Sequence, residues 1–493
     1  MADEALPAQN QPLNEETPAV VVPVLESVEE EKKEPEAEAL KRPFMNKKIR
    51  VALLTGYNGM EFCGSQKNKD VRSVEAELEK GLYKLKMISD CNYGDLKRIG
   101  WGRATRTDKK VHALQNTFSA KVLCANTPMI PVRNEEGVIT EFKKCSLDEH
   151  LEDLRLQLNE VLPSDVKVFS LLFVSNRFHA KNFTSFREYS YFLPTFMLTP
   201  ITSLYLAAPI RPMTDEETKE KSSKHVVVRV ISGGIKKIIR QSGVEDELED
   251  QNNIHTDRNI SHITPEMYEQ MYSTRLTADQ KEKLQTQWAS FEGTKKYHNF
   301  TKDIKSHEAA AARYMMKMTA NEFMYVNKET YAVTDENDAN AIEFVRFFLK
   351  GQSFLFNQIR KMVGAMIQVF HGGLGPSFIE NTHRDNTLMV AVSPGDGLLL
   401  ELVAYENYNH LPSTKEPIMI KTRVQKEEVD AYRVGLVSYI AQRELKDKAF
   451  TCWLSWFDDN KEDYYASLHG NSGEHVEAAL LKQGEGDGVA EDL

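Results

Sequence analysis

The segment from Gly102 to Ala113 is dense in charged and hydroxyl side chains, and its one carboxylate is Asp108. Arg106 and Lys109 lie close to this residue in the sequence, and neighbouring cations lower the pKa of a carboxyl group. The group would therefore stay ionised, as a nucleophile or a general base must be. An aspartate that caps a turn or pairs with an arginine for folding fits the same motif, and for this motif alone that structural role is the commoner one.

A second polar segment, from Phe178 to Tyr191, combines cations with aromatic rings. Arg187, Tyr189 and Tyr191 alternate in the sequence, so they share one face if this segment is a strand. Such a face suits RNA, because a ring stacks on a nucleobase and a guanidinium binds phosphate. An ordinary sheet face with aromatic cross-strand packing is the competing interpretation, and it is favoured for this strip taken alone.

A third segment, from Gly351 to Gly364, has the apolar spacing of a helix that continues to Phe370 and stops at Gly372-Gly373. Gln358 and Arg360 fall outside the apolar stripe. They therefore either point into a cleft or lie on a solvated helix face.

Hydrophobic periodicity predicts the elements that must position these segments. We expect helices where apolar residues recur at helical spacing, at 74–85, 151–161 and 355–370. Strands are expected at 49–54, 111–122, 166–174, 188–192, 344–349 and 398–405. Strands and helices are intermixed along the chain, so the predicted fold class is α+β.

The net charge of −11 conceals an uneven distribution. Residues 1–40 carry 11 acidic and 2 basic side chains, and residues 458–493 carry 10 acidic and 2 basic ones. Removing these balances of −9 and −8 leaves +6 for residues 41–457. A mildly basic core between acidic ends is compatible with a polyanionic ligand, although it does not require one.

Composition also divides the chain of 493 residues into units. We expect a disordered acidic tail at 1–47, a first folded half at 48–212, and a charged, partly disordered insertion at 213–287. A second folded half at 288–411, a helical extension at 412–457 and a disordered acidic tail at 458–493 would follow.

Other features exclude some classes of protein. The five cysteines are scattered, without a CxxC pair, which fits isolated thiols in a reducing compartment rather than a disulfide framework or zinc site. We find no apolar stretch of membrane-spanning length and no secretory signal, so no membrane partner is expected. The basic cluster Lys41-Arg42 with Lys47-Lys48 and Arg50 fits a weak nuclear import signal, but a charge cluster at a domain start explains it better.

In their order and spacing, the three polar segments resemble the TruA-type tRNA pseudouridine synthases, most closely the eukaryotic branch that modifies several tRNA positions. The resemblance covers roughly residues 48–210 and 288–410. Its motifs are Tyr57-Asn58-Gly59, Arg106-Thr107-Asp108 with Val111-His112-Ala113, Arg187-Glu188-Tyr189-Ser190-Tyr191, Tyr297-His298-Asn299-Phe300, the helix from Gly351 to Gly364, and Pro394 to Tyr405. Each motif is weak to moderate alone, but together they are highly specific.

The resemblance implies a role for each candidate residue. Asp108 would be the essential catalytic carboxylate, and Tyr189 would stack on the flipped uracil and help to remove its C5 proton. Arg360 would pair with Asp108, Arg106 would contact phosphate or support the loop, and Arg187 would bind substrate. The reaction needs no metal and no cofactor.

The resemblance also implies a pseudouridine synthase fold, in which two α+β halves share a central mixed or antiparallel sheet with the RNA across a basic cleft. The expected substrate is tRNA, with mRNA or snRNA as additional candidates. We expect a monomer or a homodimer in the nucleus, with the cytoplasm or mitochondrion as alternative locations.

One departure from the family pattern concerns the catalytic loop, which usually reads Arg-Thr-Asp-x-Gly. Lys110 stands where glycine is expected, and a glycine there serves a backbone turn that lysine adopts at some cost. The departure motivates an alternative function, a catalytically weak or inactive tRNA-binding relative that acts as an RNA chaperone. A hydrolase with an aspartate nucleophile is a third candidate, but it needs metal-binding carboxylates where Lys109 and Lys110 stand.

Overall fold

The computed structural model describes residues 45–199, 227–232, 235–240, 260–412, 414 and 416–469. Residues 1–44 of the predicted tail at 1–47, the residues from 470 onward and much of the predicted insertion lie outside the described residues.

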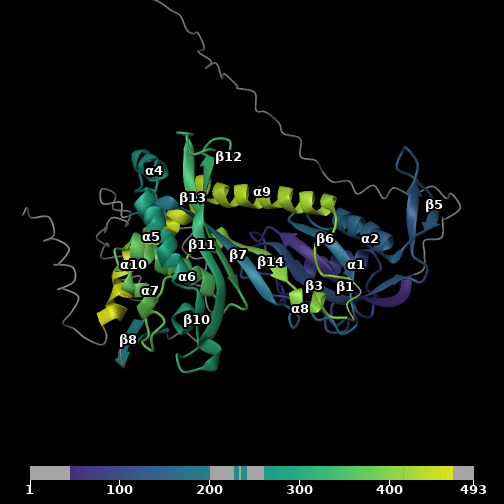
Figure 1. Cartoon of the computed structure of the whole chain (residues 1–493), viewed down its shortest axis with the longest axis horizontal. Coiled ribbons are helices and arrows are strands. Elements are labelled where there is room, and N and C mark those ends of the chain that lie inside the picture. Colours follow the sequence, from purple (N-terminus) through teal and green to yellow (C-terminus); the bar gives the residue numbers. More distant parts are fainter. Residues whose placement is uncertain are drawn as a thin grey trace, which may run out of the picture. The chain divides into compact units, whose positions relative to one another are not determined.

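One ten-stranded sheet forms the centre of the fold (Figure 1). Its strands follow the order β10 (Gly293–Lys296), β11 (Ala312–Asn327), β13 (Ala341–Gly351), β7 (Phe186–Pro194), β14 (Leu398–Ala404), β3 (His112–Ala125), β1 (Met45–Tyr57) and β6 (Val166–Phe173). Two short strands, β2 (Gly102–Arg103) and β12 (Val333–Thr334), pair with β3 and β11. All of these pairs are antiparallel except β14 with β3, which confirms a mixed sheet and the α+β class.

Strand β7 joins the two halves of the chain. It belongs to the first half in sequence, but it pairs with β13 and β14 of the second half. Tyr189 lies opposite Leu349 on one side and Leu400 on the other. The two predicted halves therefore share one continuous sheet rather than forming separate sheets.

The helices lie beside this sheet, and two hairpins stand apart from it (Figure 1). The helices are α1 (Val74–Lys84), α2 (Leu147–Val161), α4 (Pro265–Tyr272), α5 (Ala278–Ala289), α6 (Gln358–Phe370), α7 (Ser377–Asn381), α8 (Glu406–Asn409), α9 (Arg423–Leu445) and α10 (Ala449–His469). The hairpins are β4 (Met129–Arg133) with β5 (Ile139–Lys144), and β8 (Val227–Ser232) with β9 (Ile235–Arg240). Each helix and strand predicted from periodicity has a counterpart among these elements. None of the helices in the described part of the chain is both long and apolar enough to cross a membrane.

The boundaries of the predicted units need three corrections. Strand β1 begins at Met45, which pairs with Ala125, so residues 45–47 belong to the sheet and not to a tail. Residues 260–287 of the predicted insertion are folded, because Leu284 of α5 and Met271 of α4 are buried in the core. Helix α10 continues to His469, so the expected tail cannot begin at 458.

Two local predictions also change. Arg50, which we counted in the basic cluster, is buried and donates its Nε–H to the carbonyl of Phe178, so it cannot present a surface signal. The helix expected from 355 begins only at Gln358, because Asn357 adopts a left-handed conformation with φ 60°. Residues 352–357 form a loop between β13 and α6.

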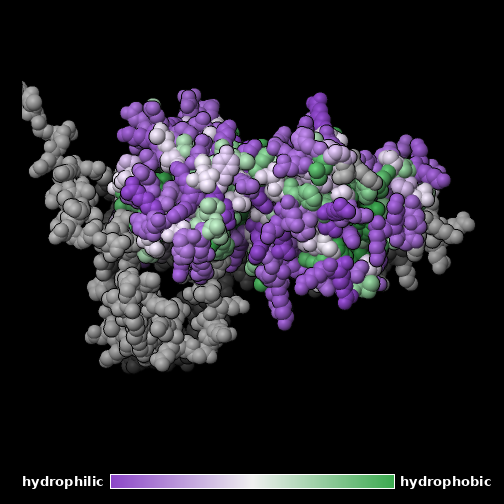
Figure 2. Space-filling view, turned by 60° about the horizontal axis from the view of Figure 1, so that its bottom comes forward, coloured by the Kyte–Doolittle hydropathy of each residue, from purple (hydrophilic) through white to green (hydrophobic). Residues whose placement is uncertain are grey.

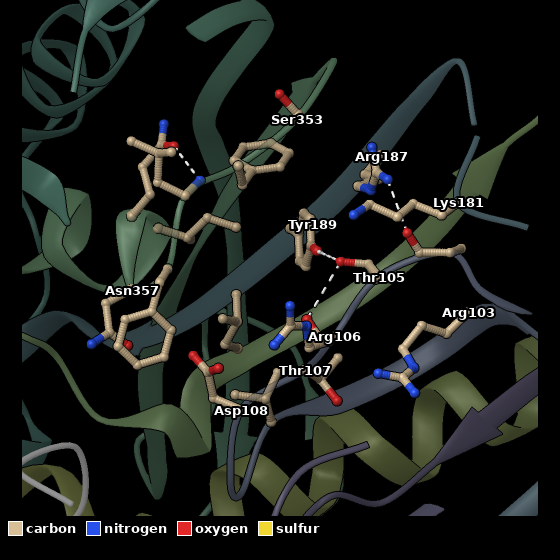
Figure 3. A pocket seen from close by; sticks show the side chains of 18 of the residues that line it. Arg103, Thr105, Arg106, Thr107, Asp108, Lys181, Arg187, Tyr189, Ser353 and Asn357 are labelled. Carbon is tan, nitrogen blue, oxygen red and sulfur yellow. Dashed lines mark hydrogen bonds between the residues drawn. The ribbon is translucent and has the colours of Figure 1, made fainter. Parts of the chain in front are cut away.

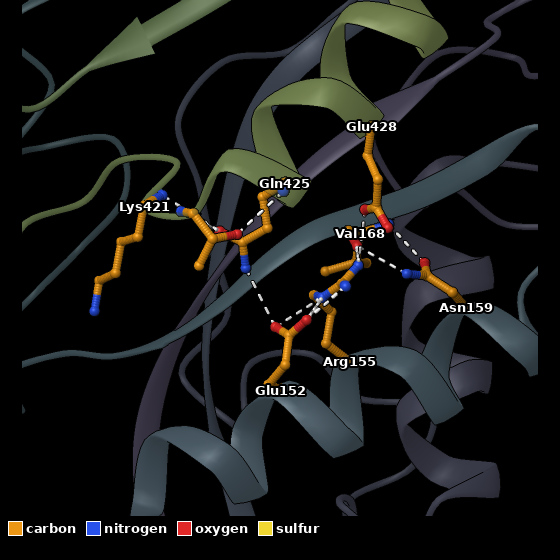
Figure 4. A network of polar contacts seen from close by, with 8 residues as sticks. Glu152, Arg155, Asn159, Val168, Lys421, Gln425 and Glu428 are labelled. Atoms are coloured by element: carbon orange, nitrogen blue, oxygen red, sulfur yellow. Dashed lines mark hydrogen bonds and ion pairs between the residues drawn. The ribbon is translucent and has the colours of Figure 1, made fainter.

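Helix α9 is held to the first half of the chain by polar contacts (Figure 4). Arg155 of α2 is buried, and its guanidinium lies 3.1 Å from the carboxylate of Glu428. Gln425 donates to Glu152 over 3.2 Å, which adds a second link between the two helices. A buried guanidinium needs such partners, so these contacts hold α9 against the outer side of β6 and α2.

Farther along α9, further side chains contact the centre of the sheet. Arg433 pairs with Glu401 of β14 at 3.0 Å, and Arg443 pairs with the buried Asp396 just before β14 at 2.9 Å. The ring of Tyr439 meets the ring of His112 edge to face, with centroids 5.9 Å apart. Helix α9 therefore supports β14 and β3 where they pair, immediately after the predicted catalytic loop.

Candidate active site

A pocket of about 830 Å³ lies where the three polar segments meet (Figure 3). Its lining comes from residues 101–108 and 111, from β7 and the loop before it, and from residues 353–360. Arg313 of β11 and Leu398 of β14 complete it. Of the five predicted site residues, all line this pocket: Asp108, Arg106, Arg187, Tyr189 and Arg360.

Asp108 is half-buried and begins a tight turn. The amide of Val111 donates to the carbonyl of Asp108 at 3.2 Å, and Lys110 has a φ of 65°. A turn with a positive φ at its third residue is a type II turn, which favours glycine at that position. The backbone requirement that we inferred from the family's glycine is therefore present, and Lys110 meets it.

Contacts behind the turn hold it in place. Thr107 donates its amide to Ser65 Oγ at 3.0 Å, and its hydroxyl lies 2.9 Å from the hydroxyl of Tyr57. A Cβ atom at Gly59 would lie 2.1 Å from the carbonyl oxygen of Val111, so only glycine permits this approach. This explains the Tyr57-Asn58-Gly59 motif, which packs against the turn that begins at Asp108.

Tyr189 forms the inner wall of the pocket. Its side chain is 5% exposed, its hydroxyl lies 3.5 Å from Thr105 Oγ1, and its ring meets Phe354 edge to face at 5.0 Å. Burial raises the pKa of the Tyr189 phenol above its ordinary value, with a smaller contribution in the same direction from Asp108. The phenol is therefore neutral near pH 7, and in this form its hydroxyl can donate a hydrogen bond.

Arg187 connects two sides of the pocket. Its guanidinium donates to the carbonyl of Gln352 at 2.8 Å and to the carbonyl of Ala104 at 2.9 Å. The carbonyl of Ala104 precedes the turn at Asp108, and the carbonyl of Gln352 precedes α6. The geometry thus gives Arg187 a role in positioning these two segments. From the sequence we had predicted only that Arg187 binds substrate.

Arg360 projects from the first turn of α6 and is 1% exposed. Its Nε donates to the carbonyl of Ser393 at 2.7 Å, and the Ser393 hydroxyl donates to the carbonyl of Arg360 at 2.9 Å. A Cβ atom at Gly364 would lie 1.9 Å from the carbonyl oxygen of Ala391, so glycine allows α6 to approach this segment. Arg360 shares the pocket with Asp108, and their ion pair stays a prediction.

Arg106 is exposed at the edge of the pocket, and Figure 3 shows Asp108 between Arg106 and Asn357. Tyr191, which we placed on the same strand face as Tyr189, does not line the pocket. It is fully buried and donates its hydroxyl to the carbonyl of Pro394 at 2.7 Å. Gln358 lines the pocket but is also buried, where its side-chain oxygen accepts from the amide of Leu355.

The pocket is strongly cationic. Among the described residues that line it, Asp108 is the one carboxylate, and six residues are cationic: Arg103, Arg106, Lys181, Arg187, Arg313 and Arg360. Arg103 forms an ion pair with the buried Glu75, which lies outside the lining. Figure 2 shows a face of the molecule where hydrophilic residues predominate and hydrophobic ones lie mainly in recesses. A cationic pocket of this kind fits an anionic ligand such as a nucleic-acid backbone.

Sequence patterns missed some residues of the pocket. Arg313 belongs to β11, which we did not predict because its burial pattern lacks regular alternation. Phe356 and Asn357 were assigned to a helix, although the Asn-Gln step at a helix start is a recognisable capping signal. Among the described residues, no three histidine, cysteine or acidic side chains are grouped so that they would hold a metal ion.

The fold and this pocket together define the class, which is that of the pseudouridine synthase fold: a mixed sheet in an α+β chain, with the carboxylate of Asp108 in a cationic pocket. A family model described as tRNA pseudouridine synthase matches residues 288–406. This match covers part of the chain and agrees with the resemblance of the three polar segments to the TruA-type pseudouridine synthases.

Known relatives align with most of the chain. A protein of Eremothecium gossypii named tRNA pseudouridine synthase 1 is 26% identical over 83% of this chain and 74% of its own length. The mouse pseudouridylate synthase 1 homolog is 24% identical over 90% of this chain and 81% of its own length. A protein of Schizosaccharomyces pombe named tRNA pseudouridine synthase 2 is 24% identical, with coverages of 88% and 95%.

Proposed function

We propose that this protein is a tRNA pseudouridine synthase, an isomerase that converts specific uridines in tRNA to pseudouridine with Asp108 as the essential carboxylate. The observation that carries the proposal is the position of Asp108, which is the one carboxylate among the described residues that line the cationic pocket and which shares this pocket with Tyr189. The names of the aligned relatives support tRNA as the substrate class.

The reaction breaks the bond between C1′ of the ribose and N1 of uracil and forms a bond between C1′ and C5. The C5 proton is lost and N1 gains a proton, so the product is an isomer of uridine. Asp108 is the group that attacks the nucleoside or removes a proton from it. Three steps fit this role: addition to the sugar, addition to the base, and abstraction of a sugar proton.

The surrounding residues have complementary roles. Tyr189 stacks on the everted uracil and is the candidate group to assist removal of the C5 proton, because its hydroxyl lies inside the pocket. Arg360 keeps Asp108 ionised and oriented. Arg106, which is exposed at the edge, contacts phosphate. Eversion of a base costs a few kcal/mol, and contacts with the tRNA backbone supply this energy.

Substitution of Asp108 by asparagine tests the proposal. Tritium release from tRNA labelled at C5 of uracil should fall to background in Asp108→Asn, while tRNA affinity stays within a few-fold of wild type because the shape of the side chain is kept. Asp430→Asn, at an exposed position of α9, is the matched control and should keep full activity. Tritium release by Asp108→Asn at the wild-type rate, or a wild-type protein that releases none, would overturn the proposal.

The chaperone alternative rested on Lys110, and the turn in which Lys110 lies still brings Asp108 into the pocket. This favours the enzyme. Messenger RNA and small nuclear RNA are further proposed substrates, tested by mapping pseudouridine in total RNA with and without the protein. A nuclear location and a monomeric state are also proposals, which imaging and sedimentation test against the cytoplasm or mitochondrion and against a homodimer.

A further inference from the structure

Phe356 is an exposed aromatic residue at the pocket. Its side chain is 51% exposed, and of the large hydrophobic side chains that the described residues leave exposed, Phe356 is the one that also lines the pocket. Scattered exposed hydrophobic residues are normal on protein surfaces, so its exposure alone has no functional meaning. Its position in the lining of the pocket that contains Asp108 requires a further explanation.

The loop that carries Phe356 is fixed by hydrogen bonds. The amide of Leu355 donates to Gln358 Oε1 at 2.8 Å, and the amide of Gln358 donates to the carbonyl of Leu355 at 3.1 Å. Upstream, the carbonyl of Gln352 accepts from Arg187, and its amide donates to the carbonyl of Tyr314 at 3.2 Å. The exposed ring therefore projects from a backbone that is tied at both ends.

The two phenylalanines of this loop have different environments. Phe354 packs edge to face on Tyr189 inside the pocket, whereas Phe356, two residues later, remains exposed. Tyr189 is 5% exposed and can contact only a base that has entered the pocket. Phe356 is exposed enough to contact a group that stays outside. The loop thus presents one ring to the interior and another to the solvent.

The charge around Phe356 indicates what that outer group is. Arg106 is exposed at the edge of the same pocket, and Figure 3 shows it across Asp108 from Asn357, the residue that follows Phe356. An aromatic ring with a nearby cation matches a nucleotide, since the ring stacks on the base and the cation binds phosphate. A protein or lipid partner would not explain why this ring lines the same pocket as Asp108.

We propose that Phe356 stacks on the nucleobase next to the target uridine once that uridine is everted into the pocket. This inference rests on the proposed function. Eversion leaves one face of the neighbouring base without its stacking partner, and an exposed ring at the mouth of the pocket covers that face. Phe356 then stabilises the everted state, while Tyr189 stacks on the everted base itself.

Three variants at this position test the proposal. Stacking of a base on an aromatic side chain, measured by alanine substitution, corresponds to about 5- to 150-fold in affinity. Phe356→Ala should therefore lower kcat/KM for tRNA by about 10-fold or more. Phe356→Trp should restore the rate and Phe356→Leu should not, because stacking needs a planar ring. Tyr93→Ala removes a ring of similar exposure, 43%, outside the pocket lining and should leave the rate unchanged.

A fluorescence measurement reports on stacking directly. Tyr93→Ala and Phe356→Ala are each combined with Asp108→Asn, which blocks turnover, and 2-aminopurine replaces the base on either side of the target uridine. The ring of Phe356 should quench one of the two probes on binding, and Phe356→Ala should abolish that quenching while Tyr93→Ala retains it. Thermal unfolding of each variant should match wild type, because Phe356 is outside the core.

The outcomes separate the two proposals. If wild-type protein releases tritium and Asp108→Asn does not, but Phe356→Ala retains both the rate and the quenching, the stacking role is refuted and the enzymatic function stands. If wild-type protein releases no tritium from tRNA, the proposed function itself has failed. Stacking would also be refuted if Phe356→Ala lowers the rate but Phe356→Leu is as active as Phe356→Trp. An aliphatic contact would then be sufficient.

Discussion

Replacement of Lys110 by glycine should stabilise the protein. Lys110 is the third residue of the turn that begins at Asp108, and its φ of 65° places it in the left-handed region. An L-residue with a Cβ atom pays roughly 1–2 kcal/mol to adopt this conformation, because the Cβ atom approaches a carbonyl oxygen. Glycine has no Cβ atom and avoids this cost.

The unfolded state opposes part of this gain. A glycine increases the conformational entropy of the unfolded chain, which offsets roughly 0.4–1 kcal/mol. The expected net increase in the free energy of unfolding is about 0.5–1 kcal/mol, or about 1 °C in Tm for a chain of this size. Lys110→Ala separates the backbone from the side chain, since alanine keeps the Cβ atom and loses the interactions of the lysine chain.

Urea unfolding of wild type, Lys110→Ala and Lys110→Gly measures the effect. The glycine variant should be more stable than the alanine variant by about 0.5–1 kcal/mol, with equal m-values. Its turnover should equal that of wild type, because glycine prefers the same turn and leaves Asp108 in place. An alanine variant as stable as the glycine variant would show that the turn imposes no strain on residue 110.

Three further predictions concern the pocket and its support. Tyr189→Phe should keep tRNA affinity but slow single-turnover tritium release, and release at the wild-type rate would show that the hydroxyl moves no proton. Arg187→Lys should lower kcat/KM by roughly 10-fold, because an ammonium cannot hold both carbonyls as the planar guanidinium does and a charged hydrogen bond contributes roughly 1.5–3 kcal/mol; unchanged kinetics would remove its positioning role. Burial lowers the pKa of His112 to about 4, with a smaller opposing contribution from Asp396 and a smaller contribution in the same direction from Arg443. The unfolded chain binds this proton near pH 6.5, so stability should fall by about 2 kcal/mol from pH 7 to 5, and His112→Asn should remove that part of the pH dependence in urea unfolding.

Local sequence patterns were sufficient for elements with one clear buried face. Strand β1 and helix α6 were predicted because runs of buried residues leave the corresponding apolar signal. The same holds for the catalytic segments, whose residues form motifs within a few positions of each other. Their convergence in one pocket followed from the family resemblance and not from the patterns, since spacing alone does not place Asp108 near residue 360.

The failures have physical reasons. Helix α5 buries Leu284 and Trp288 within a sequence of mainly charged and amide residues, so composition suggested an insertion. Strand β11 is long and presents an irregular burial pattern, because its register shifts between Thr319 and Glu322. The parallel pairing of β14 with β3 joins residues nearly 300 positions apart and leaves no local signal.

The position of the pocket explains why both halves of the chain are needed for it. Tyr189 lies on β7, whose main-chain hydrogen bonds with β13 and β14 fix its register against the second half. Asp108 precedes β3, which pairs with β14 through His112 and Ala113. Because β14 also pairs with β7, this one strand fixes the positions of both the turn at Asp108 and Tyr189. Reacting groups must be placed within a fraction of an ångström for efficient catalysis. Backbone pairing across β7, β14 and β3 provides this precision, and Arg187 extends it to the loop before α6.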